Sequence, residues 1–259
     1  MAPQLNGRVA LITGASSGIG RVTAVLFIEQ GASVAITGRQ VDYLEETKRL
    51  CLEKGVSADK VFIVVGEMEN DEDVQKIYSQ TMEHFGKLDI LVCNHGTRFH
   101  PGGVRDPVEV LQRTMRVNVE SVIRLTQLAT EELVKNKGSV VVTSSIVSST
   151  PVAMNAYYGI SKAAIDYYVR CLANDLGPRG IRVNAVNPGF VSTDFFTRQV
   201  GMSQEQTDKV FEKQSKVNPL RRTGKSEEIA GVIAFLASDE ASYVNGAIWP
   251  VDGGQLNAR

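Results

Sequence analysis

The chain has few of the residues that mark disulfide-stapled, membrane-spanning or metal-binding proteins. Its 259 residues include only three cysteines, and these are far apart and form no Cys-x-x-Cys pair: Cys51, Cys93 and Cys171. We therefore expect small buried thiols in a reducing compartment, not a disulfide or zinc framework. No apolar run approaches the roughly 18 residues that cross a bilayer, and no apolar leader segment stands at the start. The sequence predicts a cytoplasmic location and no membrane partner.

The chain also lacks an excess of positive or negative charge. The formal net charge is −1, so there is no electrostatic reason to expect a nucleic-acid partner. There are only three histidines, and His95 and His100 do not form a metal-ligand cluster, so we expect no metal. With 43% hydrophobic and 22% charged residues, the composition is that of an ordinary globular protein. We expect a single domain over residues 1–259.

Short β-branched segments alternate with helical ones along almost the whole chain. The expected strands are Val9–Thr13, Ser33–Thr37, Val61–Val65, Ile90–Asn94, Ser139–Thr143, Arg182–Val186 and Ala247–Pro250. The expected helices are Ile19–Gln30, Val41–Lys54, Asp71–Phe85, Val110–Asn136, Asn155–Leu176 and Ser226–Ser238. The strands are apolar throughout instead of alternating, as in sheets covered on both faces. This order predicts an α/β fold of the Rossmann type, with a doubly wound, seven-stranded parallel sheet.

One irregular stretch interrupts the alternation. It spans about residues 188–217, follows the sixth strand, and includes a short helix expected near Gln204–Gln214. A long excursion at the ligand-binding edge of such a sheet is typical of a substrate lid.

A glycine-rich loop follows the first strand and opens the first helix. Its cofactor-binding candidates are Gly14, Ser16, Ser17, Gly18, Ile19 and Gly20. Glycines at such a place let the backbone turn tightly and approach a pyrophosphate, whose charge the helix N-terminus balances. The loop could be a structural turn alone, but its position at the start of a β-α-β unit favours dinucleotide binding.

The end of the second strand indicates which dinucleotide. An NAD site requires a carboxylate here, whereas an NADP site replaces it with a cation. No Asp or Glu occurs between Glu29 and Asp42, and Arg39 offers a planar fork for a 2′-phosphate. The sequence therefore predicts NADP(H), although Arg39 could also cap the strand in solvent.

Tyr158 and Lys162 are the candidate proton-transfer pair. They are four residues apart, which places them one turn apart on the same face of a helix. A lysine ammonium beside a phenol lowers the phenol's pKa, which makes Tyr158 a candidate proton donor or acceptor. Tyr157 has no such partner, because Ser161 lies four residues beyond it. Alone the pattern is common on helix surfaces, so its context decides.

These motifs occur in an order that resembles the short-chain dehydrogenase/reductase family. The resemblance rests on Thr13–Gly20, Ser145, the Tyr158–Lys162 pair and Asn187-Pro188-Gly189, and it extends to the terminal Val251-Asp252-Gly253-Gly254. It implies that Tyr158 is the catalytic acid/base and that Lys162 lowers its pKa and holds the nicotinamide ribose. Ser145 would polarise the substrate carbonyl, and Asn118 would support a proton-relay water.

The resemblance also implies further cofactor contacts and an assembly. The contacts would be Glu67, Met68, Asn94, Gly96, Tyr158, Lys162, Pro188, Gly189, Val191 and Thr193. The family's usual Asn-Asn-Ala-Gly is here Cys93-Asn94-His95-Gly96, and its usual Asp-Val is Glu67-Met68. We expect His95 to be a packed side chain, although it could titrate beside the cofactor. A homotetramer is implied as well.

The expected reaction interconverts a ketone or aldehyde and a secondary alcohol. Apolar residues that could line the pocket for a small hydrophobic substrate are Val147, Met154, Phe190, Phe195 and Phe196. Two alternatives stay open: a reductase of 3-oxoacyl groups on an acyl carrier protein, and a dinucleotide-binding sensor without turnover. Glu131 and Glu132 lie where carrier-binding relatives place basic residues, which weakens the first.

Overall fold

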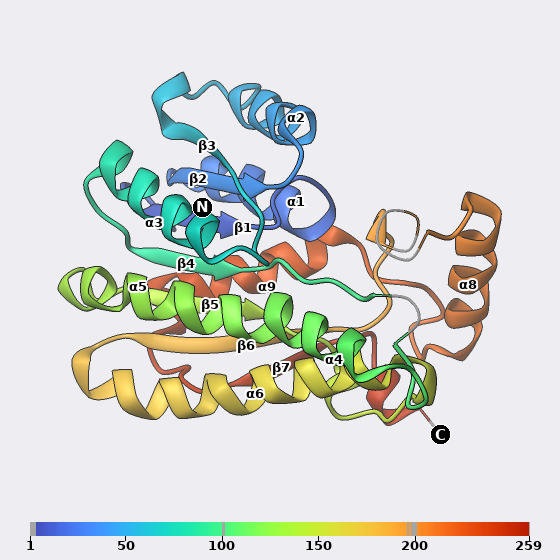
Figure 1. Cartoon of the computed structure of the whole chain (residues 1–259). Helices are drawn as coiled ribbons and strands as arrows, with labels where there is room; N and C mark the ends of the chain where they lie inside the picture. The colour runs from blue at the N-terminus through green and yellow to red at the C-terminus, as the bar shows by residue number, and fades with distance from the viewer. Residues whose placement is uncertain (1–3, 100–101, 196, 198–200, 259) are drawn as a thin grey trace.

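A computed structural model of the chain describes residues 4–99, 102–195, 197 and 201–258 (Figure 1). It contains one parallel sheet with strand order β3-β2-β1-β4-β5-β6-β7. The strands are β1 (Val9–Thr13), β2 (Ser33–Gly38), β3 (Val61–Val65), β4 (Ile90–Cys93), β5 (Ser139–Thr143), β6 (Arg182–Pro188) and β7 (Ile248–Val251). The expected doubly wound, seven-stranded α/β architecture is confirmed, and the strand ends shift by one or two residues.

Helices cover both faces of the sheet. On one face lie α1 (Gly18–Glu29), α2 (Val41–Leu52) and α9 (Ser226–Ala237). On the other lie α3 (Asp71–Phe85), α5 (Ser121–Lys135) and α6 (Ala156–Leu176), and α4 (Val108–Met115) precedes α5 (Figure 1). Between β6 and α9 comes α8 (Gln204–Val217), which lies away from the sheet at the side of the molecule.

Two apolar cores explain why the strands are hydrophobic without alternation. In β1, Ala10 and Ile12 pack into the core under α1 and α9, whereas Leu11 packs into the core under α3 and α5. All three side chains are completely buried. Because successive residues of a strand point to opposite faces, both sets must be apolar when both faces are covered.

The structure corrects two expectations about the segments outside the strands. The single helix expected over Val110–Asn136 is divided by a π-helical turn at Arg116–Glu120 between α4 and α5. No glycine or proline marks this point, because a π-turn inserts a residue without requiring either. Cys171 is exposed, since it lies on the outer face of α6. Within the described residues, no helix is both long and apolar enough to cross a membrane.

Candidate active site

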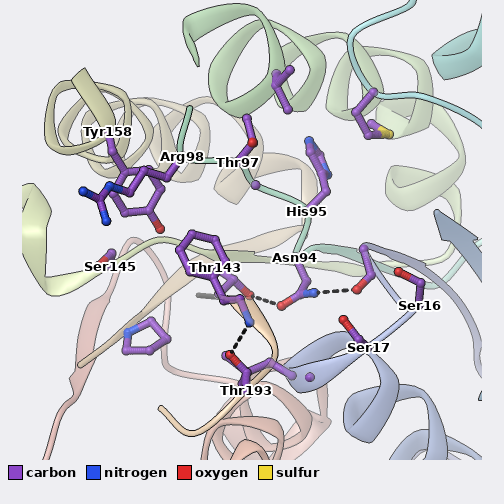
Figure 2. Close-up of a pocket in the computed structure, with 18 of the residues that line it drawn as sticks. Ser16, Ser17, Asn94, His95, Thr97, Arg98, Thr143, Ser145, Tyr158 and Thr193 are labelled. Carbon is purple, nitrogen blue, oxygen red and sulfur yellow. Dashed lines mark hydrogen bonds between the residues drawn. The ribbon is translucent and has the colours of Figure 1, made fainter. Parts of the chain in front are cut away.

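A cavity of about 320 Å³ lies at the carboxyl ends of the parallel strands (Figure 2). Segments that follow β1 through β6 line it, and residues at the start of α6 complete its wall. Carboxyl strand ends at the point where a sheet order reverses are where doubly wound folds bind ligands. Of the candidate catalytic residues, Ser145, Tyr158 and Lys162 line the cavity.

The glycine loop is built for close approach. Gly14 has a φ of +63°, and a Cβ there would lie 2.9 Å from the His95 Cα. At Gly20 a Cβ would lie 2.3 Å from the Gly14 carbonyl oxygen, so this glycine lets α1 pack against the loop and is not itself on the cavity wall. Ser17 precedes α1, and its side chain caps none of the helix's first amides. Such an uncapped N-terminus suits an anionic group.

Ser145 stands at the end of β5 with its backbone held in place. Its carbonyl accepts from the Asn187 side-chain amide at 3.1 Å, which ties the β5 end to the Asn-Pro-Gly segment. The hydroxyl of the neighbouring Ser144 donates to the Lys162 carbonyl at 3.3 Å and is buried. The Ser145 hydroxyl instead accepts from the Val147 backbone nitrogen at 3.4 Å and lies near enough to the Tyr158 phenol to lower its pKa. The two serines therefore act on different groups: Ser144 on the Lys162 backbone and Ser145 on the Tyr158 phenol.

The electrostatics of Tyr158 and Lys162 differ from the expectation. Burial raises the pKa of Tyr158 to about 12, and the Ser145 hydroxyl and the charge of Arg98 oppose that rise. Burial also lowers the pKa of Lys162 to about 8, against the opposing charge of Asp166. The Lys162 Nζ donates to the Thr143 carbonyl at 2.8 Å and lies 5.6 Å from the centre of the Tyr158 ring. Burial therefore reverses the lowering of the phenol's pKa that the sequence predicts, and Lys162 is not among the groups that oppose the rise.

Asn118 lies outside the cavity wall, in the π-turn, and its side chain is buried. Its amide nitrogen donates to the Thr97 carbonyl at 2.9 Å and to the Ser161 hydroxyl at 3.0 Å. Its amide oxygen accepts from the Thr97 backbone nitrogen at 2.8 Å. The side chain therefore clamps the segment after β4 against the helices through three hydrogen bonds.

The Asn94 side chain likewise connects separate segments, here the glycine loop and the end of β5. Its amide nitrogen donates to the carbonyls of Thr13 and Gly14 at 3.3 and 3.2 Å, and its oxygen accepts from the Thr143 hydroxyl at 3.1 Å (Figure 2). Thr143 in turn accepts from Lys162 through its carbonyl. One continuous network thus links the glycine loop to the lysine, so the two ends of the cavity are held in fixed relation.

Arg39 and Glu67 lie together at the far end of the cavity. Both line it, and Arg39 Nη1 lies 4.0 Å from Glu67 Oε1, with each side chain a little over half exposed. Met68 lines the same end. Solvent screens this ion pair, and the carboxylate competes with an anionic ligand for the guanidinium.

Comparison with known proteins identifies the family. A family model described as enoyl-(acyl carrier protein) reductase matches residues 14–255. The chain belongs to the short-chain dehydrogenase/reductase family. It is 36% identical to a glucose 1-dehydrogenase of Gluconobacter oxydans, over 96% of this chain and 91% of that one. It is 35% identical to a 3-oxoacyl-[acyl-carrier-protein] reductase of Thermotoga maritima, over 97% and 98% of the two chains.

A solved short-chain dehydrogenase/reductase from Caenorhabditis elegans, described as of unknown function and holding its cofactor, superposes with a TM-score of 0.95. The two chains are 38% identical, and the match covers 99% of this one and 98% of that one. Members of the family use a nicotinamide dinucleotide. The tight glycine loop, the uncapped α1 and the elongated cavity fit such a group. Within the described residues there is no cluster of three or more potential metal ligands.

The remaining predicted contacts divide according to whether they reach the cavity of this short-chain dehydrogenase/reductase. Those on its wall are Gly14, Ser16, Ser17, Gly18, Ile19, Gly96, Pro188, Gly189, Val191, Thr193, Val147, Phe190 and Phe195. Met154 is not on the wall, and it is 72% exposed, because it lies on the outer side of the turn before α6. Phe196 lies outside the described residues.

Several wall residues were missed by the sequence reasoning. They include Thr37, Thr97, Arg98, Phe99, Thr143 and Asn155. Thr143 and Asn155 adjoin expected elements, and proximity to the motifs could have suggested them. Arg98 carries no motif signal, although it stands four residues after Asn94 and is one of the few cations near the predicted site.

His95 is packed and neutral. Its Nδ1 lies 2.6 Å from the Thr13 hydroxyl, and its Nε2 lies 2.7 Å from the Ser121 hydroxyl. Ser121 donates its own proton to the Val117 carbonyl, so it accepts from Nε2, and Nδ1 accepts from Thr13. Burial, with a contribution from the Lys162 charge, lowers the pKa of His95 to about 3. The interpretation as a packed histidine fits this geometry.

His95 should make the fold sensitive to acid. The unfolded chain binds a proton near pH 6.5, whereas folded His95 does not until about pH 3, so stability is lost as the pH falls through this window. Between pH 7.5 and 5, one such group costs about 2 kcal/mol of unfolding free energy. We expect His95→Ala, which restores the family's small residue, to reduce the measured loss in urea unfolding by that amount. His84→Ala is the control, and an equal reduction in it would contradict the assignment.

Proposed function

We propose that this protein is an NADP(H)-dependent oxidoreductase that interconverts a carbonyl compound and a secondary alcohol. The observation that carries the proposal is the half-buried Ser145–Tyr158 pair at one end of a cavity whose other end is the glycine loop (Figure 2). A pure dinucleotide-binding sensor has no use for a proton donor on the cavity wall. The glycine loop accounts for the cofactor, and the hydroxyl pair accounts for the chemistry.

Each side chain has a distinct proposed part in the reaction. The nicotinamide supplies or accepts the hydride when bound. The Ser145 hydroxyl donates to the substrate oxygen and orients it, and Tyr158 transfers its proton to the same oxygen. With a pKa of about 12, Tyr158 is protonated at neutral pH and ready to act as an acid in the reductive direction. The cationic Lys162 stabilises the negative charge that develops next to it.

A panel of carbonyl compounds with NADPH tests the proposed function. Ketones, aldehydes and a 3-oxoacyl thioester on a carrier protein should be included, because one relative is a reductase of the last class. Turnover of free carbonyl compounds supports the proposal. Turnover of the carrier-bound thioester alone would assign the other reaction. Tight NADPH binding without any turnover would favour a sensor.

Arg39 provides the prediction on cofactor choice. Arg39→Asp should lower the preference for NADPH over NADH by about 10- to 100-fold, because a charge-assisted contact to a 2′-phosphate is worth about 1.5–3 kcal/mol. The ratio of the two kcat/KM values measures it. Lys48→Asp, on α2 and off the cavity wall, is the charge-matched control. Equal use of both cofactors by the native protein would rule out the assignment.

A further inference from the structure

Arg98 is a half-buried cation on the cavity wall for which the proposed chemistry gives no use. Its Nε is buried without a hydrogen-bond partner, and among the described residues its guanidinium forms no ion pair. A guanidinium has five N–H donors and no acceptor, so leaving it unpaired away from water is costly. An acceptor that is not part of the described chain would remove that cost.

Other half-buried arginines of the fold show what a structural role requires. Arg182 donates to the carbonyls of Leu236 and Ser238 at 2.7 and 2.8 Å. Arg21 donates to the Ser16 carbonyl at 2.6 Å and to the Thr47 hydroxyl at 3.0 Å. These two guanidinium groups are satisfied by the protein itself, whereas Arg98 is not, so a purely structural role does not account for it.

The backbone beside Arg98 is held firmly. Both the amide and the carbonyl of the preceding Thr97 are bonded to the Asn118 side chain. On the other side, Phe99 packs beneath the Arg113 guanidinium, 4.1 Å from the ring centre. Such anchoring on both sides is what a preorganised recognition group needs, because little entropy is lost when the ligand binds.

Arg98 lies at the reacting end of the cavity. In Figure 2 it stands next to Tyr158 and near Ser145, on the side away from Ser16 and Ser17. The charge of Arg98 lowers the pKa of Tyr158, as expected of neighbouring groups. Phe195, whose ring centre lies 6.3 Å from that of Tyr158, supplies an apolar wall nearby. A ligand here meets one cation beside an aromatic surface.

The acidic residues of the cavity wall do not use this cation. They are Glu67, Glu69 and Asp194. Glu67 faces Arg39, Glu69 is bonded to Arg113 at 2.8 Å, and no ion pair joins Asp194 to Arg98 among the described residues. A single planar guanidinium is matched in charge and shape by one carboxylate.

We propose that Arg98 binds a carboxylate of the substrate, so that the reacting compound is an oxo acid, or the corresponding hydroxy acid, with an apolar body. This inference rests on the proposed function and narrows its substrate class. The carboxylate would pair with Arg98 while the carbonyl oxygen meets Ser145 and Tyr158, which fixes the substrate at two points.

Matched aryl oxo acids and their methyl esters test the inference, because esterification removes the charge and keeps the body. A series with zero to three methylenes between the carbonyl and the carboxylate covers the unknown spacing. For the best acid, kcat/KM should exceed that of its ester by about 10- to 100-fold. Arg98→Met should lower the acid's value by a similar factor and the ester's by much less. Arg124→Met, which removes an exposed cation that is paired with Asp71 and lies off the wall, should leave the ratio unchanged.

Two results would overturn the inference while leaving the proposed function intact. One is an ester reduced as well as its acid by the native protein. The other is an equal loss for acid and ester in Arg98→Met with a shifted pH profile, which would make Arg98 an electrostatic partner of Tyr158 only. If no carbonyl compound is turned over, the proposed function fails instead. Calorimetric binding of 4-phenylbutyrate to the NADPH complex then still tests the site, and loss of that binding in Arg98→Met supports it.

Discussion

Tyr158→Phe is expected to lower kcat/KM for carbonyl reduction by a thousandfold or more and to change the dissociation constant of NADPH by less than about threefold. The substitution removes one hydroxyl, which the proposed mechanism uses to protonate the substrate oxygen. General acid catalysis contributes about 10²–10⁴ to a rate, and the lost hydrogen bond to the developing oxyanion adds to this. Steady-state kinetics with NADPH gives the first quantity, and fluorescence titration gives the second.

The adjacent tyrosine provides a matched control. Tyr157 donates its hydroxyl to the Asp106 carbonyl and does not reach the cavity wall. Tyr157→Phe should therefore keep its turnover and lose about 1 kcal/mol of unfolding free energy, the usual value of one hydrogen bond. Residual activity above about a tenth in Tyr158→Phe, or an equal loss in both variants, would reject the assigned role of Tyr158.

The fold could be predicted because its determinants are local and repeated. A strand such as β1 is apolar at every position, and it is followed at once by a glycine turn and a helix. That order requires crossovers, and crossovers require a parallel sheet covered on both faces. The break between α4 and α5 escaped prediction, because a π-turn depends on tertiary contacts, here those of Asn118 with Thr97, and not on a breaker residue.

The part of the candidate site that belongs to sequence motifs could be predicted. Ser145, Tyr158 and Lys162 are brought to one cavity from β5 and α6, as their spacing indicated. Spacing could not show that Lys162 is committed to a carbonyl, nor that Arg98 comes to face the phenol from the segment after β4. Both facts depend on which side chains the folded protein buries together. Burial also sets the direction of each pKa, which is why the expected lowering for Tyr158 is reversed.

Lys162 is expected to show the second large effect. Lys162→Met should lower turnover by about a thousandfold, because it removes the buried cation at the end of the network that starts at the glycine loop. The same substitution relieves the burial of a charge, while it leaves the Thr143 carbonyl without its donor. The first effect stabilises the fold and the second destabilises it, each by about 1–4 kcal/mol. The free energy of unfolding at neutral pH should therefore be nearly unchanged.

The pH dependence of stability separates this account from a simple loss of structure. The folded pKa of Lys162 is lowered to about 8 from 10.5, so the unfolded chain holds the proton over a range where the folded chain has released it. The contribution of Lys162 to the free energy of unfolding therefore rises as the pH increases from about 8 toward 10.5. Between pH 7.5 and 9.5, the native protein should gain about 2 kcal/mol relative to Lys162→Met in urea unfolding. Lys76→Met, at an exposed lysine paired with Asp73, controls for loss of an ammonium group in general. If the free energy of unfolding changes with pH in the same way for the native protein and Lys162→Met, Lys162 is not a buried ammonium. That result would contradict its proposed role in stabilising the developing negative charge.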